Sequence, residues 1–168
     1  MSKGFKRCFV RSKEAKRIIK DASERLGLRN DVLMPNAKVE LVETDFCQLF
    51  LVNGEPILFK VDEKIFPTLF FNEAVRFLPK VVVDMGAVPH VCNGANVMAP
   101  GVVCLEGNFN RGEVVVVIDE RHGKPLAIGE SLFTSLEFSE MKHGTVVKNF
   151  HFVGDKIWKL ARSLIDKF

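Results

Sequence analysis

The chain has 168 residues, of which 47% are hydrophobic and 27% are charged, so it is long and apolar enough to bury a core. No apolar run is long enough to cross a bilayer, which excludes a helical membrane protein. The basic N-terminus is not followed by the apolar segment of a secretory signal, so we expect a cytoplasmic protein.

The formal net charge is only +3, but the charge is unevenly distributed. Residues 1–29 carry a net +7 and residues 142–168 a net +4, whereas residues 30–141 carry a net −8. If the two ends of the chain meet in space, they form a basic surface on an acidic body, which suits a partner with a phosphate backbone. Charged ends that merely solvate the chain explain the same distribution equally well.

The cysteines predict reduced thiols and no metal site. Cys8, Cys47, Cys92 and Cys104 form no C-x-x-C pair, and a disulfide framework is not expected in a chain of this size without a secretory signal. The spacing of His90, Cys92 and Cys104 fits no standard zinc-ligand pattern. We therefore expect neither a metal nor another cofactor.

A strand-like segment and an amphipathic helix open the chain. Aromatic and basic residues alternate over residues 5–11. A helix is predicted over residues 13–26, with Ser12 as its cap and Gly27 at its end. One face is apolar, and the other carries Lys13, Lys16, Arg17 and Lys20. Such a basic face either contacts RNA or is simply solvated.

Strands and a short helix complete the first unit. Residues 38–43 predict a strand, and residues 46–52 and 56–61 predict a hairpin around Asn53-Gly54, a pair that tolerates positive φ. A short helix is expected within residues 66–80, with Pro67 and Thr68 at its start. Residues 1–78 are therefore interpreted as a small α+β domain.

The remainder predicts a mixed β-barrel over residues 79–160 and a tail over residues 161–168. Strands are expected at residues 80–84, 113–120 and 125–131, a short helix or turn at 134–141, and a final hairpin of strands at 146–153 and 156–160. Residues 84–102 hold three glycines and two prolines among apolar residues. We expect a short helix there, with Val88, Val91, Val97 and Met98 in the core.

No motif of a known enzyme class is visible. The sequence has no P-loop, no dinucleotide-binding glycine motif and no G-x-S-x-G elbow. The histidines at positions 90, 122, 143 and 151 show no metal-ligand pairing, and His122 and His143 lie in glycine turns that should face solvent. The sequence favours a binding module over an enzyme.

The segment "VVVDMGAVPHVCNGANVMAPGV" resembles the start of the PUA domain, which is named for pseudouridine synthases and archaeosine transglycosylases. The shared pattern is a strand, Asp-x-Gly-Ala at 84–87, a short helix, Gly-Ala-Asn-Val at 94–97 and Pro-Gly-Val at 100–102. The segments "GEVVVVIDE…GKPLAIGES" and "GTVVKNFHFVGDKIWKL" are similar to the remaining strands of that family. The resemblance covers residues 79–160 and implies a PUA pseudobarrel.

The first unit also resembles a known family. The segments "LFLVNGEPILF" and "FPTLFF…RFLPK" are similar to the unit that precedes the PUA domain in the malignant-T-cell-amplified-sequence proteins and their archaeal stand-alone relatives. This resemblance implies binding to structured RNA, either tRNA or rRNA, and not to DNA. It also implies an association with translation, on the small ribosomal subunit with a density-regulated-type protein partner, in initiation or recycling.

The resemblance assigns the glycine-flanked helix and the strand after it to the RNA-facing surface. The residues implied are Gly86, Ala87, His90, Asn93, Gly94, Ala95 and Asn96, with Lys148 and His151 on the late strand. Glycine lets a backbone approach a phosphate or sugar closely, although turn geometry alone also explains these glycines. His90 and Asn93 contact RNA or only hydrogen-bond the short helix.

The implied surface contains neither lysine nor arginine between residues 84 and 102. Phosphate charge would have to be met by the two ends of the chain, by Arg111, or by Arg121 and Lys124. The leading hypothesis is a non-catalytic RNA-binding protein associated with translation. The alternatives are a protein-interaction adaptor and an accessory specificity subunit of a tRNA or rRNA modification enzyme.

Overall fold

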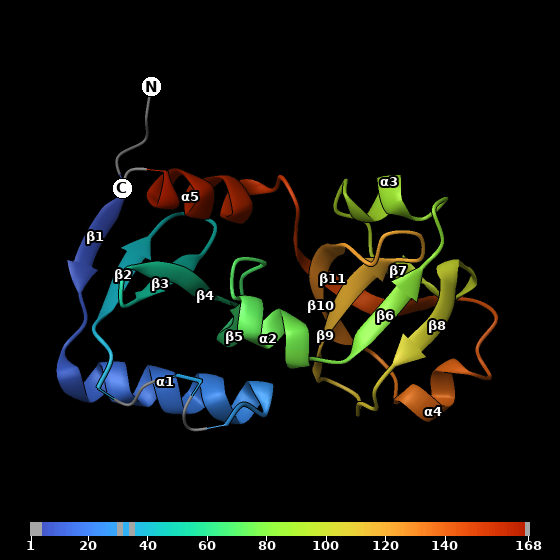
Figure 1. Cartoon of the computed structure of the whole chain (residues 1–168), viewed down its shortest axis with the longest axis horizontal. Helices are drawn as coiled ribbons and strands as arrows, with labels where there is room; N and C mark the ends of the chain where they lie inside the picture. Colours follow the sequence, from blue (N-terminus) through green and yellow to red (C-terminus); the bar gives the residue numbers. More distant parts are fainter. Residues whose placement is uncertain (1–4, 30–31, 34–35, 167–168) are drawn as a thin grey trace.

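The molecule consists of two units, each built around one β-sheet, and the two units lie side by side (Figure 1). The structure is a computed structural model that describes residues 5–29, 32–33 and 36–166. The first sheet has five antiparallel strands in the order β1-β2-β3-β4-β5. The second has six strands in the order β7-β11-β10-β9-β6-β8, in which only the β6–β9 pair is parallel. The α+β class and the mixed barrel-like second unit are confirmed.

The first sheet is packed between two helices. Helix α1 (Ser12–Leu26) lies along one side of it and helix α5 (Lys156–Ile165), from the far end of the chain, lies along the other (Figure 1). Each helix turns a buried stripe toward the sheet at helical spacing. The strands are β1 (Lys6–Phe9), β2 (Val39–Glu43), β3 (Gln48–Val52), β4 (Glu55–Val61) and β5 (Lys64–Pro67).

The second sheet follows a short helix, α2 (Asn72–Phe77). Its strands are β6 (Lys80–Val83), β7 (Val97–Met98), β8 (Val102–Glu106), β9 (Val114–Asp119), β10 (Pro125–Ser131) and β11 (Thr145–Phe152). Helix α3 (Val88–Val91) and the 3-10 turn η1 (Ala99–Gly101) join β6 to β8 through β7, and helix α4 (Ser135–Phe138) precedes β11.

Strand β9 is buried on both of its faces. Val114, Val116 and Ile118 belong to the same core as the first sheet and its helices, whereas Val115 and Val117 belong to the core of the second unit. A strand buried on both faces needs an unbroken apolar run rather than an alternating one, and this strand has it. The two units therefore share part of one hydrophobic core.

A buried carboxylate ties the two units together. Glu130 of β10 accepts hydrogen bonds from Arg25 Nη2 of α1 and from Lys64 Nζ of β5, both at 2.9 Å. Arg25 also donates to the carbonyls of Ile65 and Gly112 at 3.0 Å. Burial raises the pKa of Glu130, but the hydrogen bonds from Lys64 and Arg25 outweigh it and hold the pKa below its ordinary value. The carboxylate is therefore ionised at neutral pH.

Aromatic rings fill the boundary beside this carboxylate. Phe66 of β5 stacks on Phe150 of β11 with ring centroids 4.4 Å apart, and Phe59 meets the ring of His151 edge-on at 5.3 Å. The imidazole Nε2 of His151 accepts the backbone N–H of Leu69 at 3.2 Å. The two nitrogens of this fully buried ring are thus occupied, because Nδ1 lies 3.0 Å from the carboxylate of residue 155.

Three element predictions are confirmed in place, and two of them are corrected in detail. Helix α1 ends at Gly27, whose φ is 63°, as predicted, but Ser12 is its first residue and the preceding Arg11 provides no side-chain cap. The Asn53-Gly54 turn has positive φ at both residues. The helix expected within residues 66–80 is shorter, because residues 64–67 complete the hairpin of β4 with β5 and the helix begins only at Asn72.

The strand predicted at residues 156–160 is wrong. That segment begins helix α5, and Asp155 caps it by accepting the N–H of Trp158 at 2.7 Å. The apolar residues that face the sheet, Ile157, Ala161 and Leu164, have helical spacing. Residues 161–165, assigned to a tail on the sequence, are the second half of this helix.

Gly129 in β10 is required by a close approach rather than by its backbone angle. A Cβ at this position would lie 2.7 Å from the carbonyl oxygen of Lys148 on β11 and would overlap the side chain of Val147. The register of β10 with β11 shifts at this point, between Ile128 and Gly129, so that Phe150 is left out of the one-to-one pairing. The bulge changes which residues of β11 face each core.

Replacing the boundary carboxylate by an amide should destabilise the whole chain. In Glu130→Gln, Arg25 and Lys64 lose their counter-charge, and we expect the free energy of unfolding to fall by about 1–3 kcal/mol at pH 7. Chemical denaturation measures the change. The exposed Glu140→Gln is the control and should change stability by less than about 0.5 kcal/mol.

The same comparison has a pH dependence with a defined sign. Because the folded-state pKa of Glu130 is lowered, its stabilising contribution is complete above the ordinary carboxyl pKa. It is lost as the pH falls below that value and through the folded-state pKa. The gap between wild type and Glu130→Gln should therefore narrow on acidification, and a gap that stays constant would contradict this role.

Candidate nucleic-acid interface

A turn anchored by Asp84 begins the candidate surface. The N–H of Asp84 donates to the carbonyl of Gly101 at 2.9 Å, which places the start of β8 beside the end of β6. The carboxylate of Asp84 accepts the N–H of Ala87 at 2.8 Å and so fixes the chain as it enters α3. This local geometry explains why residues 84–87 and 100–102 keep a fixed spacing in the sequence.

A hollow of about 470 Å³ lies between this turn, helix α3 and strand β7. Most of its lining is apolar, and polar groups come from Asp84, His90 and Asn96. Met98, expected in the core, is 49% exposed and lines this hollow, whereas Val91 and Val97 are buried as predicted. The hollow therefore offers apolar contact together with a few hydrogen-bonding groups.

Four of the predicted site residues line the hollow: Ala87, His90, Ala95 and Asn96. The other three residues predicted in this segment, Gly86, Asn93 and Gly94, are exposed beside them in the chain. The side chains of His90 and Asn93 make no hydrogen bond within the described residues, so neither caps α3. Their polar groups are available to a ligand.

Gly94 is needed by the backbone whatever it binds. Its φ is 95°, and a Cβ there would lie 3.2 Å from Cε1 of Phe152. Gly86 has no positive φ, and a Cβ there would meet only the carboxylate of Asp84, at 3.3 Å. Turn geometry therefore accounts for Gly94 but only weakly for Gly86.

Strand β11 holds the segment after α3 through a residue that the sequence did not single out. Asn149 donates from Nδ2 to the carbonyls of Val91 and Ala95, at 3.1 and 3.0 Å. Its backbone N–H donates to Oδ1 of Asn96 at 2.9 Å. Asn149 thus positions the glycine segment, and only its neighbourhood to Lys148 in the sequence could have drawn attention to it.

Of the two residues of β11 expected at the RNA-facing surface, one is exposed and the other is buried. Lys148 is exposed, with its Nζ 4.9 Å from the centre of the Phe150 ring. His151 has no exposed area and lies in the boundary between the units. His151 is therefore a structural residue of that boundary and does not belong to the candidate interface.

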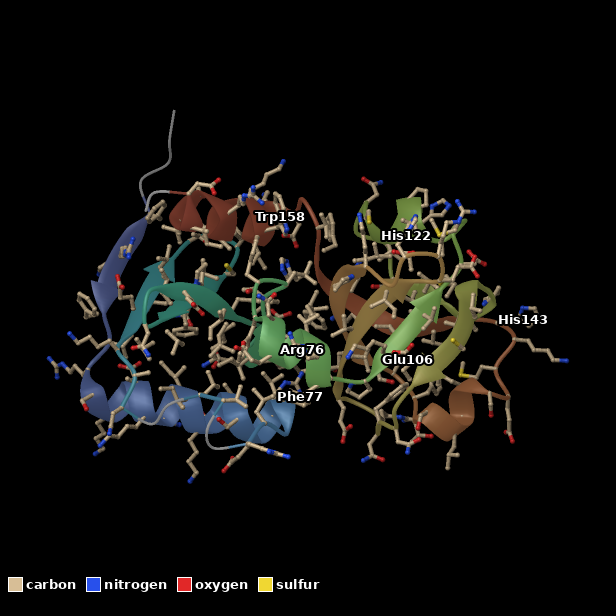
Figure 2. The ribbon with its side chains drawn as sticks, viewed as in Figure 1. Arg76, Phe77, Glu106, His122, His143 and Trp158 are labelled. Atoms are coloured by element: carbon tan, nitrogen blue, oxygen red, sulfur yellow. The ribbon has the colours of Figure 1, made fainter. Side chains whose placement is uncertain are left out.

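The tip of the β9–β10 hairpin adds basic groups beside the hollow. Oε1 of Glu120 accepts the N–H of Met85 at 3.2 Å, so the tip touches the turn that opens the candidate surface. Figure 2 shows His122 at the same end of the second unit as α3. Arg121 and Lys124 are exposed there, and neither forms an ion pair with another described residue.

The same tip is held rigid by one carboxylate. Asp119 accepts the backbone N–H groups of Arg121, His122 and Lys124. The N–H of His122, followed by those of Lys124 and Arg121, holds the pKa of Asp119 below its ordinary value. The basic side chains of the tip are therefore presented from a fixed backbone.

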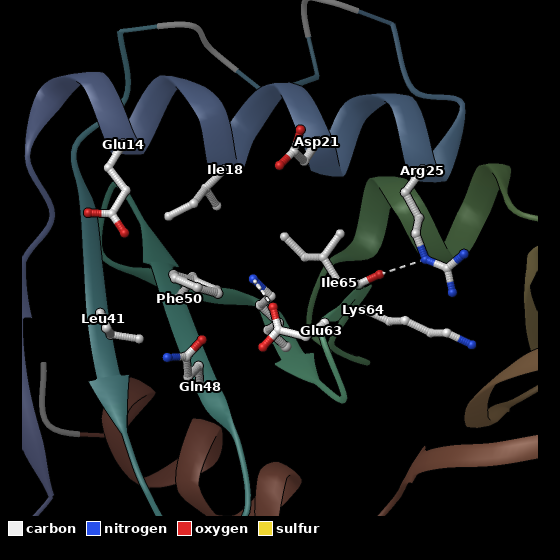
Figure 3. Close-up of a pocket in the computed structure, with 11 residues that line it drawn as sticks. Glu14, Ile18, Asp21, Arg25, Leu41, Gln48, Phe50, Glu63, Lys64 and Ile65 are labelled. Carbon is white, nitrogen blue, oxygen red and sulfur yellow. Dashed lines mark hydrogen bonds and ion pairs between the residues drawn. The ribbon is translucent and has the colours of Figure 1, made fainter.

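A second hollow, of about 330 Å³, lies between α1 and the first sheet (Figure 3). Carboxylates of Glu14, Asp21 and Glu63 line it. Each cation in its lining is already paired with a carboxylate: Arg25 and Lys64 with Glu130, and Lys60 with Glu63. Uncompensated negative charge makes this hollow unsuitable for a phosphate backbone.

The cysteines and acidic side chains show no further site. All four cysteines are free thiols. Among the residues that the structure describes, no group of three or more His, Cys, Asp or Glu side chains could hold a metal ion. No helix of the described chain is long and apolar enough to span a bilayer.

Two family models match the chain, one in each unit. Residues 79–153 match the PUA domain, and residues 6–72 match a domain of unknown function, DUF1947. An uncharacterized protein of Methanocaldococcus jannaschii is 40% identical over 91% of this chain and 95% of its own length. Translation machinery-associated protein 20 of Saccharomyces cerevisiae is 30% identical over 78% of this chain and 77% of its own length.

Further relatives agree with this pairing of units. Malignant T-cell-amplified sequence 1 of Danio rerio is 27% identical over 78% of this chain and 76% of its own length. Among solved structures, a hypothetical protein of Pyrococcus horikoshii superposes with a TM-score of 0.80 at 35% identity, over 93% of this chain and 99% of the other. The similarity therefore extends across both units.

Removing the side chain of Asn149 should loosen the glycine segment. In Asn149→Ala the carbonyls of Val91 and Ala95 lose the side-chain amide that donates to both, and only that of Val91 keeps a backbone donor among the described residues, the N–H of Gly94. We expect a loss of about 1–2 kcal/mol in stability. Amide hydrogen exchange should become faster over residues 91–96. The exposed Asn108→Ala, whose side chain bonds no described residue, is the control, and equal exchange in both variants would refute the positioning role.

Proposed function

We propose that this chain is a non-catalytic protein that binds structured RNA. The chain belongs to the PUA-domain proteins with an N-terminal DUF1947 unit. It is related to translation machinery-associated protein 20 and malignant T-cell-amplified sequence 1. Its RNA would be tRNA or the rRNA of the small ribosomal subunit. The names of the relatives support a role in translation, which we assign to initiation or recycling.

The apolar hollow beside two unpaired cations is the observation that carries this proposal. A nucleobase needs an apolar contact and a few hydrogen-bonding partners, and the hollow supplies both, through its apolar lining and through His90 and Asn96. A phosphate needs a cation, and Arg121 and Lys124 stand at the adjacent hairpin tip. The two kinds of contact together fit a nucleotide strand.

Asp84 argues for a sugar or base rather than a phosphate within the hollow itself. Its carboxylate lines the hollow and would repel a phosphate placed there, but it accepts hydrogen bonds readily. A ribose 2′-hydroxyl or an exocyclic amino group donates such a bond. The hollow therefore favours an unstacked nucleotide, with its phosphates at the rim.

The first test is binding of the wild-type protein to tRNA, followed by fluorescence anisotropy across a salt series. RNA binding through phosphates should weaken as salt rises, with a log–log slope of about −0.7 to −0.9 for each phosphate neutralised. Salt-independent binding or no binding would contradict the proposal and favour a protein-interaction adaptor, for which a density-regulated-type protein is the partner that the family resemblance implies.

Co-sedimentation with small ribosomal subunits then separates the two remaining roles. A translation factor should sediment with the subunit. An accessory subunit of a tRNA or rRNA modification enzyme should instead bind the free RNA and remain behind. Isolation of the RNA that co-purifies with the protein, followed by sequencing, would identify the ligand directly.

Removal of the two hairpin-tip cations should weaken RNA binding without affecting the fold. In Arg121→Ala/Lys124→Ala, two phosphate contacts are lost, so the salt slope should become shallower by about 1.4–1.8 and affinity at 0.1 M salt should fall roughly 10- to 50-fold. Both backbone N–H groups still donate to Asp119, so the melting temperature should not change.

The matched control removes an exposed cation that lies away from the hollow. Arg76 is exposed on α2, at the boundary side of the first unit (Figure 2), and its side chain pairs with no described carboxylate. Arg76→Ala should keep the wild-type slope. Equal losses in this variant and in the double variant would mean that the charge acts non-specifically.

A further inference from the structure

Strand β11 leads directly from the candidate surface into helix α5. Phe152 lies beneath Gly94, where a Cβ would approach its ring to 3.2 Å, and the exposed Val153 follows. Gly154 and the cap residue Asp155 then turn the chain into α5, whose first residue is Lys156. Only a few residues therefore separate the glycine segment from the start of the helix, and α3 and α5 lie along the same upper edge in Figure 1.

The outward face of α5 is basic. Lys156, Lys159 and Arg162 are all exposed, because the opposite side of the helix is packed on the first sheet. Lys159 has no ion-pair partner among the described residues. Arg162 pairs only with the exposed Asp166, a contact that solvent screens strongly. Three cations thus follow one another at i, i+3 spacing along about 9 Å of helix.

An aromatic ring accompanies these cations. Trp158 is half-buried, tilted against Phe70 with centroids 5.8 Å apart, and the guanidinium of Arg162 lies 5.7 Å from its ring centre. Figure 2 places Trp158 at the end of α5 nearer the second unit. Aromatic side chains beside cations form platforms on which unpaired bases stack.

The basic elements near the two ends of the chain differ in their position relative to the candidate surface around α3. Figure 1 draws the start of β1 and the end of α5 at the same corner of the first unit. The basic residues of α1 lie on the other side of the first sheet, away from α3. Of the two basic helices, only α5 continues the candidate surface.

We infer that the outward face of α5, defined by Lys156, Trp158, Lys159 and Arg162, is a second RNA-binding surface that extends the candidate surface across the boundary between the units. The inference rests on the proposed function and specifies it further. One RNA strand places a nucleotide in the hollow by α3, crosses the turn at Val153–Gly154, and lays its phosphates along α5. The cations of α5 supply attraction that residues 84–102 lack.

The first test removes two cations from α5 and compares the result with the same change on α1. In Lys159→Ala/Arg162→Ala, affinity for tRNA at 0.1 M salt should fall roughly 10- to 50-fold and the salt slope should become shallower by about 1.4–1.8. In the control Lys16→Ala/Lys20→Ala, which removes the same charge from the exposed face of α1, affinity should stay within about twofold of wild type. Melting curves establish that each variant is folded.

The second test uses the intrinsic fluorescence of the protein. Trp158 is the only tryptophan in the chain, so its emission reports on the α5 surface alone. Titration with tRNA should change this emission with the same midpoint as the anisotropy. In the Arg121→Ala/Lys124→Ala variant the change should remain and shift to higher RNA concentration.

The outcomes separate this inference from the proposed function. If the wild type binds RNA in a salt-dependent way while Lys159→Ala/Arg162→Ala binds equally well, or while Trp158 emission does not change on titration, the inference is overturned and the proposed function stands. If only the α1 control, Lys16→Ala/Lys20→Ala, loses RNA affinity, the inference is likewise overturned and the second surface is assigned to α1. Failure of the wild type to bind tRNA overturns the proposed function, and this inference with it.

Discussion

The burial of strand β9 on both faces is the constraint on which the rest of the structure depends. Val115 and Val117 belong to the core of the second unit, whereas Val114, Val116 and Ile118 face the first unit. Without the first unit, this face of the strand and its three apolar side chains would be exposed to water. The first unit covers that face, and Glu130 with its two cations fixes the contact at its edge. A shared core and a directional ion-pair cluster together make the two units one body, so surfaces on different units keep a fixed relation.

Local sequence patterns predicted most of the strands because burial and turn chemistry act over a few residues. The apolar run of β9 and the Asn53-Gly54 turn are examples. The sequence predicts a strand in place of helix α5, because residues 156–160 follow a Gly154-Asp155 turn that suggests a hairpin and are too few to show helical spacing. The helical spacing appears only when Ala161 and Leu164 are included, and strand β4, which α5 contacts, lies about a hundred residues earlier in the chain.

The candidate site was predictable in part, through the resemblance of residues 84–102, and the rest needed three-dimensional information. The bulge between Ile128 and Gly129 displaces the pairing of β11, so alternation along that strand does not tell which side chains face out. Lys148 is consequently exposed, whereas His151 is buried between the units. Asn149, which holds the glycine segment, was not recognised because its partners are backbone carbonyls more than fifty residues away.

A last consequence of this architecture is that the apolar hollow and the cations near it lie on different elements. The hollow is lined mainly by apolar groups, and the unpaired cations Arg121 and Lys124 stand outside it, at the adjacent hairpin tip. Electrostatic attraction to a phosphate acts over roughly a Debye length, about 10 Å at 0.1 M salt, so it can be supplied from a neighbouring hairpin or helix but not from a distant one. Contact within the hollow is short-ranged and demands fixed geometry. In the proposed function, the rigid boundary between the units lets these two kinds of interaction be built on different elements and still act on one RNA strand.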